Sequence, residues 1–496
     1  MRKNAFTASF IQKAFFLFAS ASALLLFTAC MSVVKVSDFD PEPGNATAAV
    51  RKAIDSGAKQ VVFDDPGFDY IVEPIRLRSN QELIFEDGVH IRALPGGYKD
   101  RNDCLFLGNN VENVVMRGRG DAVLSMNKKD YQDPKLYQPG EWRHTVSLRG
   151  CRNVTVKDLT IRSSGGDGVY IAGGKRLWEK NDILLENLLL DDHHRQGVSV
   201  ISVNGLVIRN CRIQNTNGIQ PMCGIDFEPN SPADDVSNCL IEETEFLNNA
   251  RAGVMISIRN LDKSMDLTVR DCRIAGNFEG VYVNDVPTKG AIRFENCRIV
   301  DSRYPLTIRN KRGGLALSFS GCEIDNRSGK ADVPVMIYTE SAENCGAIDF
   351  GQFTIRQDPK RKVMKFDGFN GAGLDLPEGG ITVIGPDEKS SVFDLKKFAE
   401  EHGPNPELLN FKTCPAEFSG YVPVQQKGVR EHPFGTRNDA VFFVQYCDGK
   451  TPVELHFKTV WKREAAPPPA MPVEIFDPAG TSNGTFIVNR RISPMF

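Results

Sequence analysis

The stretch Asn153–Ile161 reads NVTVKDLTI, and it is the first clear copy of a nine-residue phrase that recurs along the middle of the chain. Six further copies begin at Asp182, Gly205, Asn238, Asp266, Ala291 and Ala316. Successive copies start 29, 23, 33, 28, 25 and 25 residues apart. Self-similarity with a period of roughly 20 to 50 residues predicts a solenoid, in which each repeat buries its apolar face by stacking on its neighbours.

Within the phrase apolar residues alternate with polar ones, which indicates strand rather than helix. A second short strand is predicted after a polar turn in each repeat, at Gly168–Ile171, Gly197–Val200, Gly224–Phe227, Gly253–Ile256, Gly280–Val283 and Pro305–Ile308. Repeats this short leave no room for crossover helices, and the leucine and asparagine spacing of leucine-rich repeats is missing. The fold class predicted is therefore all-β: a parallel β-helix, right-handed by the usual chirality of parallel connections.

Length, composition and charge agree with a large exported or soluble protein. The 496 residues provide enough chain for the solenoid and an accessory domain, and 41% of them are hydrophobic. The net charge of -3 leaves no basic footprint, so nucleic acid is not an expected partner. An acidic polysaccharide would need a local cationic groove.

The N-terminus predicts export. Arg2 and Lys3 precede the apolar stretch Ala14–Phe27, which is too short to span a membrane and is typical of a signal peptide. It ends in Phe27-Thr28-Ala29-Cys30, which resembles the lipobox of bacterial lipoproteins with Phe in place of the usual Leu. We therefore expect a signal peptide over residues 1–29 and a lipid anchor on Cys30 at the bacterial periplasm or cell surface. Ordinary cleavage after Ala29 is the alternative.

Twelve cysteines in an exported chain would normally suggest disulfides. Their position argues otherwise, because Cys211, Cys272, Cys297 and Cys322 all occupy the seventh place of the phrase. That place alternates inward, so these side chains are predicted to be small apolar core filler rather than redox or metal groups.

Three further segments complete the predicted domain order. Residues 30–60 form a linker and a capping helix, residues 61–390 the β-helix, and residues 405–496 a small β-sandwich-like domain. In that last domain Val441–Val444, Val453–Phe457 and Val473–Phe476 are predicted strands. It would serve either to bind carbohydrate or as a packing appendage.

The first part of the mature chain carries a family resemblance. A helix over Ala48–Asp55, stopped by Gly57, is followed by a strand, by Pro66-Gly67 and by Leu83–Gly88. This order resembles the opening of polygalacturonases and other members of the pectin-lyase-like superfamily, over roughly residues 40 to 350. The resemblance implies a right-handed β-helix that acts on polysaccharide along an outer face.

Candidate chemistry lies on the second strands, where the second and fourth residues counted from the Gly are expected to face outward. In one repeat alone, that of Asp226 and Glu228, both places hold acids. Two like charges so close should raise one carboxyl pKa, as a general acid requires. The alternative is a solvated acidic face or an ion pair with Arg195 or Arg251. Tyr170 and Tyr282, two repeats to either side, are expected to be sugar-stacking platforms.

The turns before these strands add further candidates. Asp167, directly before Gly168, resembles the Asp of the Asn-Thr-Asp-Gly motif of polygalacturonases, although the other catalytic motifs of that family are missing. His193, His194 and Arg195 lie one repeat below the acidic strand and are candidate substrate ligands, with Arg195 favoured because a guanidinium forks onto carboxylate or sulfate. Arg251 and Trp142 are further candidates.

Three functions remain open. The first is a glycoside hydrolase with Asp226 and Glu228 as acid and base or nucleophile, assisted by Asp167, with no cofactor. The second is a polysaccharide lyase in which Arg or His removes a proton next to a uronate carboxylate and the acids hold Ca²⁺. The third is a surface protein that binds a polysaccharide or oligosaccharide without catalysis.

Overall fold

A computed structural model describes residues 32–175, 178–284, 289–311, 313–339, 344–368 and 372–403, and the backbone of four strands between 440 and 487. Residues 1–29 and Cys30, and with them the predicted signal peptide and lipid anchor, lie outside this part of the chain. Two compact units are formed, one of residues up to 367 together with 374–402, the other of residues 368–373 and 403–496. No helix of the described residues is long and apolar enough to cross a membrane.

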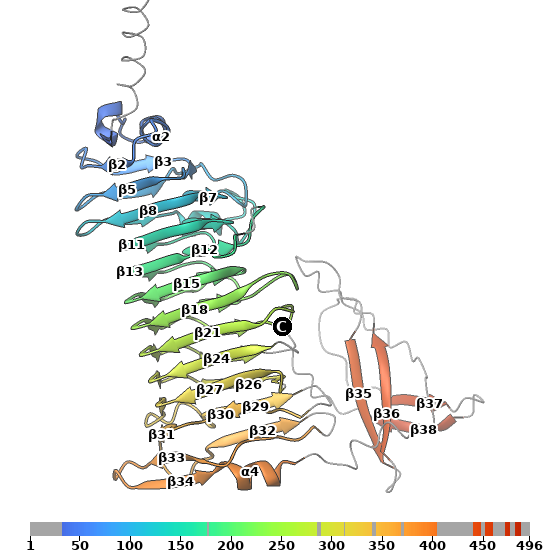
Figure 1. Ribbon diagram of the computed structural model, residues 1–496. Helices are drawn as coiled ribbons and strands as arrows, with labels where there is room; N and C mark the ends of the chain where they lie inside the picture. Colours follow the sequence, from blue (N-terminus) through green and yellow to red (C-terminus); the bar gives the residue numbers. More distant parts are fainter. Residues whose placement is uncertain are drawn as a thin grey trace, which may run out of the picture. The chain divides into compact units, whose positions relative to one another are not determined.

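The first unit is a stack of coils built from two long sheets, as predicted (Figure 1). The 11-stranded sheet consists of β4 (Ile75–Arg76), β7 (Phe106–Asn109), β10 (Val146–Arg149), β12 (Val169–Ala172), β14 (Gln196–Val200), β17 (Cys223–Phe227), β20 (Ala252–Ser257), β23 (Glu279–Asn284), β26 (Tyr304–Arg309), β29 (Val335–Thr339) and β32 (Met364–Gly368). Neighbouring strands of this sheet pair in parallel, so one coil lies directly on the next.

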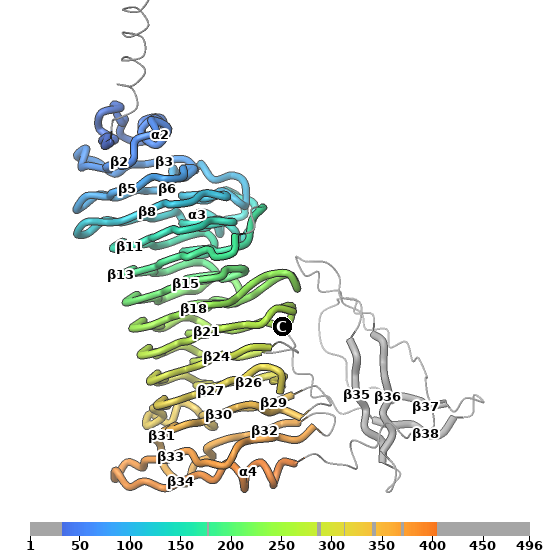
Figure 2. The backbone as a smooth tube through the Cα atoms, viewed as in Figure 1, coloured from blue at the N-terminus to red at the C-terminus, as the bar shows by residue number. Residues whose placement is uncertain are grey.

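The second sheet has 23 strands, because most coils contribute two short strands to it. They are β1 (Val33–Lys35), β2 (Gln60–Phe63), β3 (Tyr70–Val72), β5 (Gln81–Phe85), β6 (His90–Ala93), β8 (Glu112–Gly118), β9 (Val123–Ser125), β11 (Arg152–Arg162), β13 (Ile183–Asp191), β15 (Val203–Arg209), β16 (Arg212–Gln214), β18 (Val236–Glu242), β19 (Glu245–Leu247), β21 (Met265–Arg270), β22 (Arg273–Ala275), β24 (Gly290–Glu295), β25 (Arg298–Val300), β27 (Leu315–Ser320), β28 (Glu323–Asp325), β30 (Ile348–Asp349), β31 (Thr354–Arg356), β33 (Gly380–Ile384) and β34 (Ser390–Asp394). The backbone tube in Figure 2 follows these coils from β2 to β34, and β33 and β34 close the stack as an antiparallel pair.

Each nine-residue phrase is bent at one place. Its sixth residue has a positive φ in all seven copies: Asp158, Asn187, Asn210, Glu243, Asp271, Asn296 and Gly321. Asn, Asp and Gly tolerate this left-handed conformation better than other residues, which explains their recurrence there. The kink divides the phrase into the two strands of the 23-stranded sheet, or bends a continuous strand as in β11 and β13.

The seventh place points inward, as predicted. Cys211, Cys272, Cys297 and Cys322 are each at most 3% exposed and are free thiols. The interior also contains stacked aromatic rings on adjacent coils, such as Phe294 on Phe319 at 5.1 Å between centroids. The cysteines are therefore core filler, packed among apolar side chains in the way that stacking repeats require.

One end of the stack is covered by short helices, η1 (Val36–Phe39) and α2 (Thr47–Asp55). The Asn45 side chain accepts hydrogen bonds from the N–H and the hydroxyl of Thr47 at the start of α2. Val50 and Ile54 of α2 are buried, so this helix covers the apolar edge of the first coil. At the other end α4 (Leu395–Glu401) begins after Asp394, whose side chain accepts from the Lys397 N–H at 2.9 Å.

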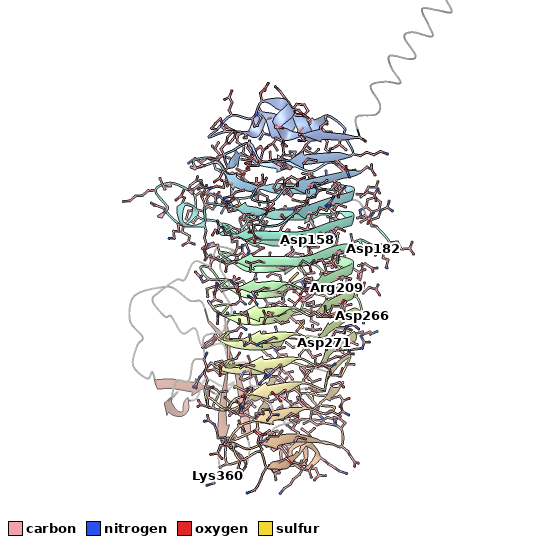
Figure 3. The ribbon with its side chains drawn as sticks, turned by 90° about the vertical axis from the view of Figure 1, so that its left-hand side faces the viewer. Asp158, Asp182, Arg209, Asp266, Asp271 and Lys360 are labelled. Atoms are coloured by element: carbon pink, nitrogen blue, oxygen red, sulfur yellow. The ribbon has the colours of Figure 1, made fainter. Side chains whose placement is uncertain are left out.

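The outer face of the 23-stranded sheet is charged and solvated. Figure 3 shows Asp158, Asp182, Arg209, Asp266 and Asp271 along this face, the last two in the same coil. Arg209 lies 2.6 Å from Glu242 on the next coil and pairs with Glu186 on the previous one. Exposed ion pairs of this kind stabilise a fold by at most about 1 kcal/mol each. They form an ordinary solvated surface, and the unusual electrostatics belong to the other sheet.

In the second unit the described backbone forms two antiparallel hairpins. One pairs β35 (Ala440–Cys447) with β36 (Pro452–Thr459), and the other pairs β37 (Pro472–Phe476) with β38 (Ser482–Ile487). Strands are thus found at the three predicted segments, and the β-sandwich arrangement remains a prediction.

Candidate active site

The second residues of the predicted second strands form a ladder along the 11-stranded sheet, as the repeat pattern predicts, but their exposure to solvent differs from the prediction. Tyr170, Ser199, Asp226, Met255 and Tyr282 lie opposite one another on successive strands. The last four are each at most 9% exposed. The alternation that directs them away from the core is therefore right, and the expectation that they face solvent is wrong, because loops and neighbouring side chains cover this face.

Arg195 is the centre of the candidate site. The turn from β13 to β14 places it directly before Gln196, with its backbone N–H donating to the carbonyl of Gly166. Its guanidinium donates two parallel hydrogen bonds to Glu228, at 2.7 and 3.0 Å. It also lies 3.2 Å from Glu141 and 3.8 Å from Asp167. One cation thus contacts three carboxyl groups, each from a different coil or loop.

This pairing is the alternative that the sequence left open for Glu228. Burial disfavours the charge of Arg195, but the neighbouring charges of Glu228 and Asp167 raise its pKa well above the ordinary value. The Arg195 side chain is 14% exposed and that of Glu228 is 22% exposed. A bidentate, partly buried pair is stronger and more rigid than a surface pair. Arg195 is therefore a fixed part of the acidic cluster.

Asp226 is almost completely buried, with 1% of its surface exposed. Gln196 donates from Nε2 to its Oδ2 at 2.9 Å, and the Gln196 side-chain oxygen Oε1 accepts from the Cys223 N–H, which fixes the orientation of the side-chain amide. The other oxygen, Oδ1, is buried without a hydrogen-bond partner. Burial first, and then the charge of Glu228, raise the pKa of Asp226 well above its ordinary value. Of the two predicted carboxyl groups, Asp226 is thus the one whose pKa is raised.

Asp167 is a second carboxyl group with a raised pKa. It is fully buried, and burial raises its pKa to about 7 although Arg195 opposes the shift. Its backbone N–H donates to Nδ1 of His144 at 3.1 Å, so that ring nitrogen is unprotonated. The carboxyl oxygen Oδ2 lies 3.2 Å from the same nitrogen. Protonation of Asp167 removes the repulsion between these two acceptors, and burial also keeps His144 neutral by lowering its pKa.

A loop between β9 and β10, which contains α3 (Lys128–Tyr131), covers this cluster and supplies Glu141. Lys128 of α3 is 2.5 Å from Asp192 and donates to the carbonyl of His193. Further along, Arg143 is completely buried, with its guanidinium 5.3 Å from the Tyr131 ring. Lys128 thus ties the loop to the turn that carries Arg195, and Arg143 packs against α3 of the same loop.

Sequence reasoning missed Glu141. It lies directly before Trp142, Arg143 and His144, a run of large polar and aromatic residues that does mark the loop as part of this coil. The repeat pattern does not extend into this loop, so the sequence could not predict which loop residue lies beside Arg195.

The two predicted histidine ligands are positioned differently from the prediction. His193 is fully buried, and its Nδ1 lies 2.9 Å from the Ser164 hydroxyl inside the turn. Burial lowers its pKa to about 3. His194 contacts Gln132 of the covering loop at 2.9 Å, and burial lowers its pKa to about 4. Both rings pack the turn and the loop, so Arg195 is the member of the predicted trio that joins the carboxylates.

The predicted aromatic platforms are also covered. The Tyr170 ring stacks on His144 at 4.5 Å between centroids. Tyr282 is 6% exposed, with the Arg251 guanidinium 5.6 Å from its ring. Trp142 lies beneath a guanidinium at 5.4 Å. Tyr282 is therefore buried at its predicted position, and Tyr170 is partly exposed with one ring face covered by His144.

Arg251 itself belongs to the next coil, where it pairs with Glu279 at 3.1 Å. It lies near enough to oppose the upward shift of the Asp226 pKa. Among the described residues no group of three His, Cys, Asp or Glu side chains is arranged to hold a metal ion.

The cluster separates carboxyl groups into two environments. Asp167 and Asp226 are buried acids with raised pKa values, whereas Glu228 is bound to a guanidinium and reaches solvent. Asp167 and Glu228 contact the same Nη1 of Arg195, at 3.8 and 2.7 Å, so their nearest oxygens are no further apart than the sum of these distances. Two carboxyl groups in such different environments are what acid and base chemistry on one bond requires.

Comparisons with known proteins agree with this fold. Residues 144–333 match the family described as "Right handed beta helix region". With its two long sheets of parallel strands and this match, the chain has a right-handed parallel β-helix fold.

Individual relatives are remote. The SPbeta prophage-derived uncharacterized protein YorA of Bacillus subtilis (strain 168) is 24% identical over 236 residues, which are 45% of this chain and 35% of that protein. The "Probable pectin lyase E" of Aspergillus niger is 28% identical over 110 residues, 21% of this chain and 28% of that protein. The chain thus spans about a third of the length of the curated relatives it matches. A hyperthermoactive exopolygalacturonase from Thermotoga maritima is 13% identical, with a TM-score of 0.45 over 73% of this chain and 96% of that one.

Proposed function

We propose that the chain is a glycoside hydrolase that cleaves a polysaccharide at the cluster around Arg195. One observation carries this proposal: Asp226, with a raised pKa, lies two residues from Glu228, which is held by Arg195. A carboxyl group with a raised pKa beside a second carboxyl group in a different environment can provide the acid and the base or nucleophile of glycoside hydrolysis.

Each residue then has a defined task. Asp226 gives its proton to the glycosidic oxygen that leaves, while Glu228 either activates water or attacks the anomeric carbon. Arg195 restrains Glu228, and Gln196 orients the carboxyl of Asp226. Because Asp226 is 1% exposed, an incoming sugar must displace a neighbouring side chain or the loop that carries Glu141. Asp167 holds a second proton beside the same guanidinium.

The lyase alternative has less support. A lyase needs a base that removes a proton from carbon, and the raised pKa of Arg195 makes its guanidinium a poor one. His144 and His193 have lowered pKa values, as a neutral base requires, but both are fully buried.

The near-complete burial of Asp167 and Asp226 favours a second candidate function, a surface protein that binds glycan without cleaving it. In that case the acidic cluster stabilises the coil and the loop, and the exposed parts of the same face bind the sugar. Enzymatic assays separate the two functions directly.

The partner proposed is a polysaccharide or oligosaccharide outside the cytoplasm, reached by a lipoprotein anchored through Cys30. A Cys30→Ser variant that remains in the membrane fraction would contradict the anchor. Pectin, the polymer in the name of one relative, is the first substrate to test.

The decisive experiment incubates the protein with a panel of neutral and acidic polysaccharides. Release of reducing ends without new near-ultraviolet absorbance identifies a hydrolase, whereas a lyase produces an unsaturated, absorbing sugar. The double variant Asp226→Asn, Glu228→Gln should lose turnover by at least about a hundredfold. The matched control is Asp271→Asn, a surface carboxyl at a sixth place of the phrase where another copy has Asn296. Full activity of the double variant refutes the assignment.

A further inference from the structure

Large exposed hydrophobic side chains gather on one edge of the coil stack. The turns and loops that lead into the strands of the 11-stranded sheet form this edge, which we call the upstream edge; Asp167 and Arg195 lie on it. Among the described residues five large hydrophobic side chains are exposed: Val33, Leu136, Ile219, Phe278 and Val392. Leu136, Ile219 and Phe278, at 53%, 39% and 50% exposure, all lie on the upstream edge.

Phe278 forms an aromatic corner with Tyr304 of the next coil. The ring centroids are 5.2 Å apart and the ring planes meet at 75°. The Tyr304 N–H donates to the carbonyl of Phe278, which ties the two turns together. Arg303 lies beside the corner, 5.9 Å from the Tyr304 ring, and is held by Asp332 at 2.6 Å. The corner is thus rigid at its backbone, half-open to solvent and flanked by a guanidinium.

The corner lies in line with the acidic cluster. The pairing of Gln196 with Cys223 places Arg195 opposite Met222. The Arg251 N–H donates to the Met222 carbonyl, and the pairing of Ala252 with Glu279 places Phe278 opposite Arg251. Arg195 and Phe278 therefore occupy the same place three coils apart, a span of about 14 Å at the usual spacing of strands.

We propose that Phe278 and Tyr304 form a sugar-stacking subsite for the glycan whose scissile bond lies at Asp226 and Glu228. A pyranose ring has an apolar C–H face and a rim of hydroxyls. The corner offers an aromatic face for the former, and Arg303 offers N–H donors for the latter. Along the same edge, a short oligosaccharide spans the distance from the carboxylates to the corner. This inference rests on the proposed function and locates where the substrate chain runs.

A small ligand fits this surface better than a protein partner does. Stable protein interfaces bury about 800 Å² on each side, which two rings and isolated aliphatic side chains cannot supply. The subsite also replaces the platforms expected at Tyr170 and Tyr282: the exposed ring comes from the turn before β23, and the ring within that strand is buried.

The test is affinity electrophoresis of the full chain in native gels that contain polygalacturonate, xylan or dextran. An inactive background, Asp226→Asn with Glu228→Gln, prevents digestion of the gel polymer. Phe278→Ala should raise the dissociation constant for the retarding polymer about tenfold, and Phe278→Trp should retain binding. Val392→Ala, which removes an even more exposed apolar side chain from β34, is the control and should bind like the background.

Kinetics provide the second readout. In the active protein, Phe278→Ala should lower kcat/KM for the polymer about tenfold and leave the turnover of substrates too short to span three coils unchanged. If no polymer is cleaved but Phe278→Ala still abolishes retardation, the hydrolase proposal fails and the subsite stands. Equal retardation of Phe278→Ala and its background overturns the subsite, as does the absence of retardation in all three gels. A background protein that self-associates through Phe278 instead identifies a contact between copies and also overturns it.

Discussion

Replacing Asp167 by Asn tests whether the buried carboxyl group is protonated in the folded protein at a pH where it is ionised in the unfolded chain. Burial raises the pKa of Asp167 from 3.8 to about 7, so the folded chain keeps a proton that the unfolded chain releases. Stability must then fall as the pH rises from about 4 to about 7, by roughly 1.4 kcal/mol for each unit of the shift and about 4 kcal/mol in total. Asn resembles the protonated carboxyl in shape and can donate to Nδ1 of His144. We therefore expect Asp167→Asn to match the wild type at pH 4 and to exceed its stability at pH 8 by up to about 4 kcal/mol.

The measurement is urea unfolding of both proteins at a series of pH values, with the slope against urea compared so that a change in cooperativity is not mistaken for stability. Asp271→Asn, which removes a surface carboxyl, controls for the change in net charge. A difference between Asp167→Asn and the wild type that stays constant from pH 4 to pH 8 refutes a raised pKa. A variant that is less stable at pH 8 shows instead that the ionised carboxylate is needed beside Arg195.

Three further substitutions test the cluster and its cover. Arg195→Met leaves buried carboxylates without their cation and should cost about 3 to 5 kcal/mol at pH 8 and less at pH 5, measured by urea unfolding; a pH-independent loss contradicts the electrostatic account. Glu141→Gln removes a charge that raises the pKa of Asp167, so the pH-dependent fall in stability should move to lower pH, and an unmoved curve excludes Glu141 from the cluster. Gly165→Ala places a methyl group 2.4 Å from a tyrosine ring of α3 and should cost about 1 to 3 kcal/mol in thermal unfolding, whereas Gly313→Ala, with open space around it, should cost little.

The coil architecture could be predicted because it is encoded locally. Alternation of apolar residues defines the strands, and the seventh place of the phrase places Cys272 and its equivalents inside. The pairing of Ser199, Asp226 and Met255 on neighbouring strands could also be predicted, because each is the second residue of its strand counted from the Gly. These properties depend on contacts between neighbouring coils that repeat along the chain, so one pattern is visible many times.

The chemistry of the site was less predictable because it depends on a loop without a pattern. Glu141 reaches Arg195 from more than fifty positions away in the sequence, and the loop that carries it is held by Lys128 and by the buried Arg143. The alternation of apolar and polar residues predicts on which face of the sheet a side chain lies, but it does not predict which loops cover that face. The ladder was therefore placed correctly, while the burial of Asp226 and Tyr282 required the structure.

The left-handed residue at the sixth place of each phrase affects how the sequence of such a protein can diverge in evolution. Because a single left-handed residue sets the bend inside each of the seven phrases, the register of one coil on the next does not depend on the length of the connections elsewhere. The spacing of the copies varies between 23 and 33 residues while the ladder stays in register. Insertions on the upstream edge can therefore lengthen, shorten or exchange loops such as the one that carries Glu141, so the surface around the acidic cluster can diversify on an unaltered scaffold.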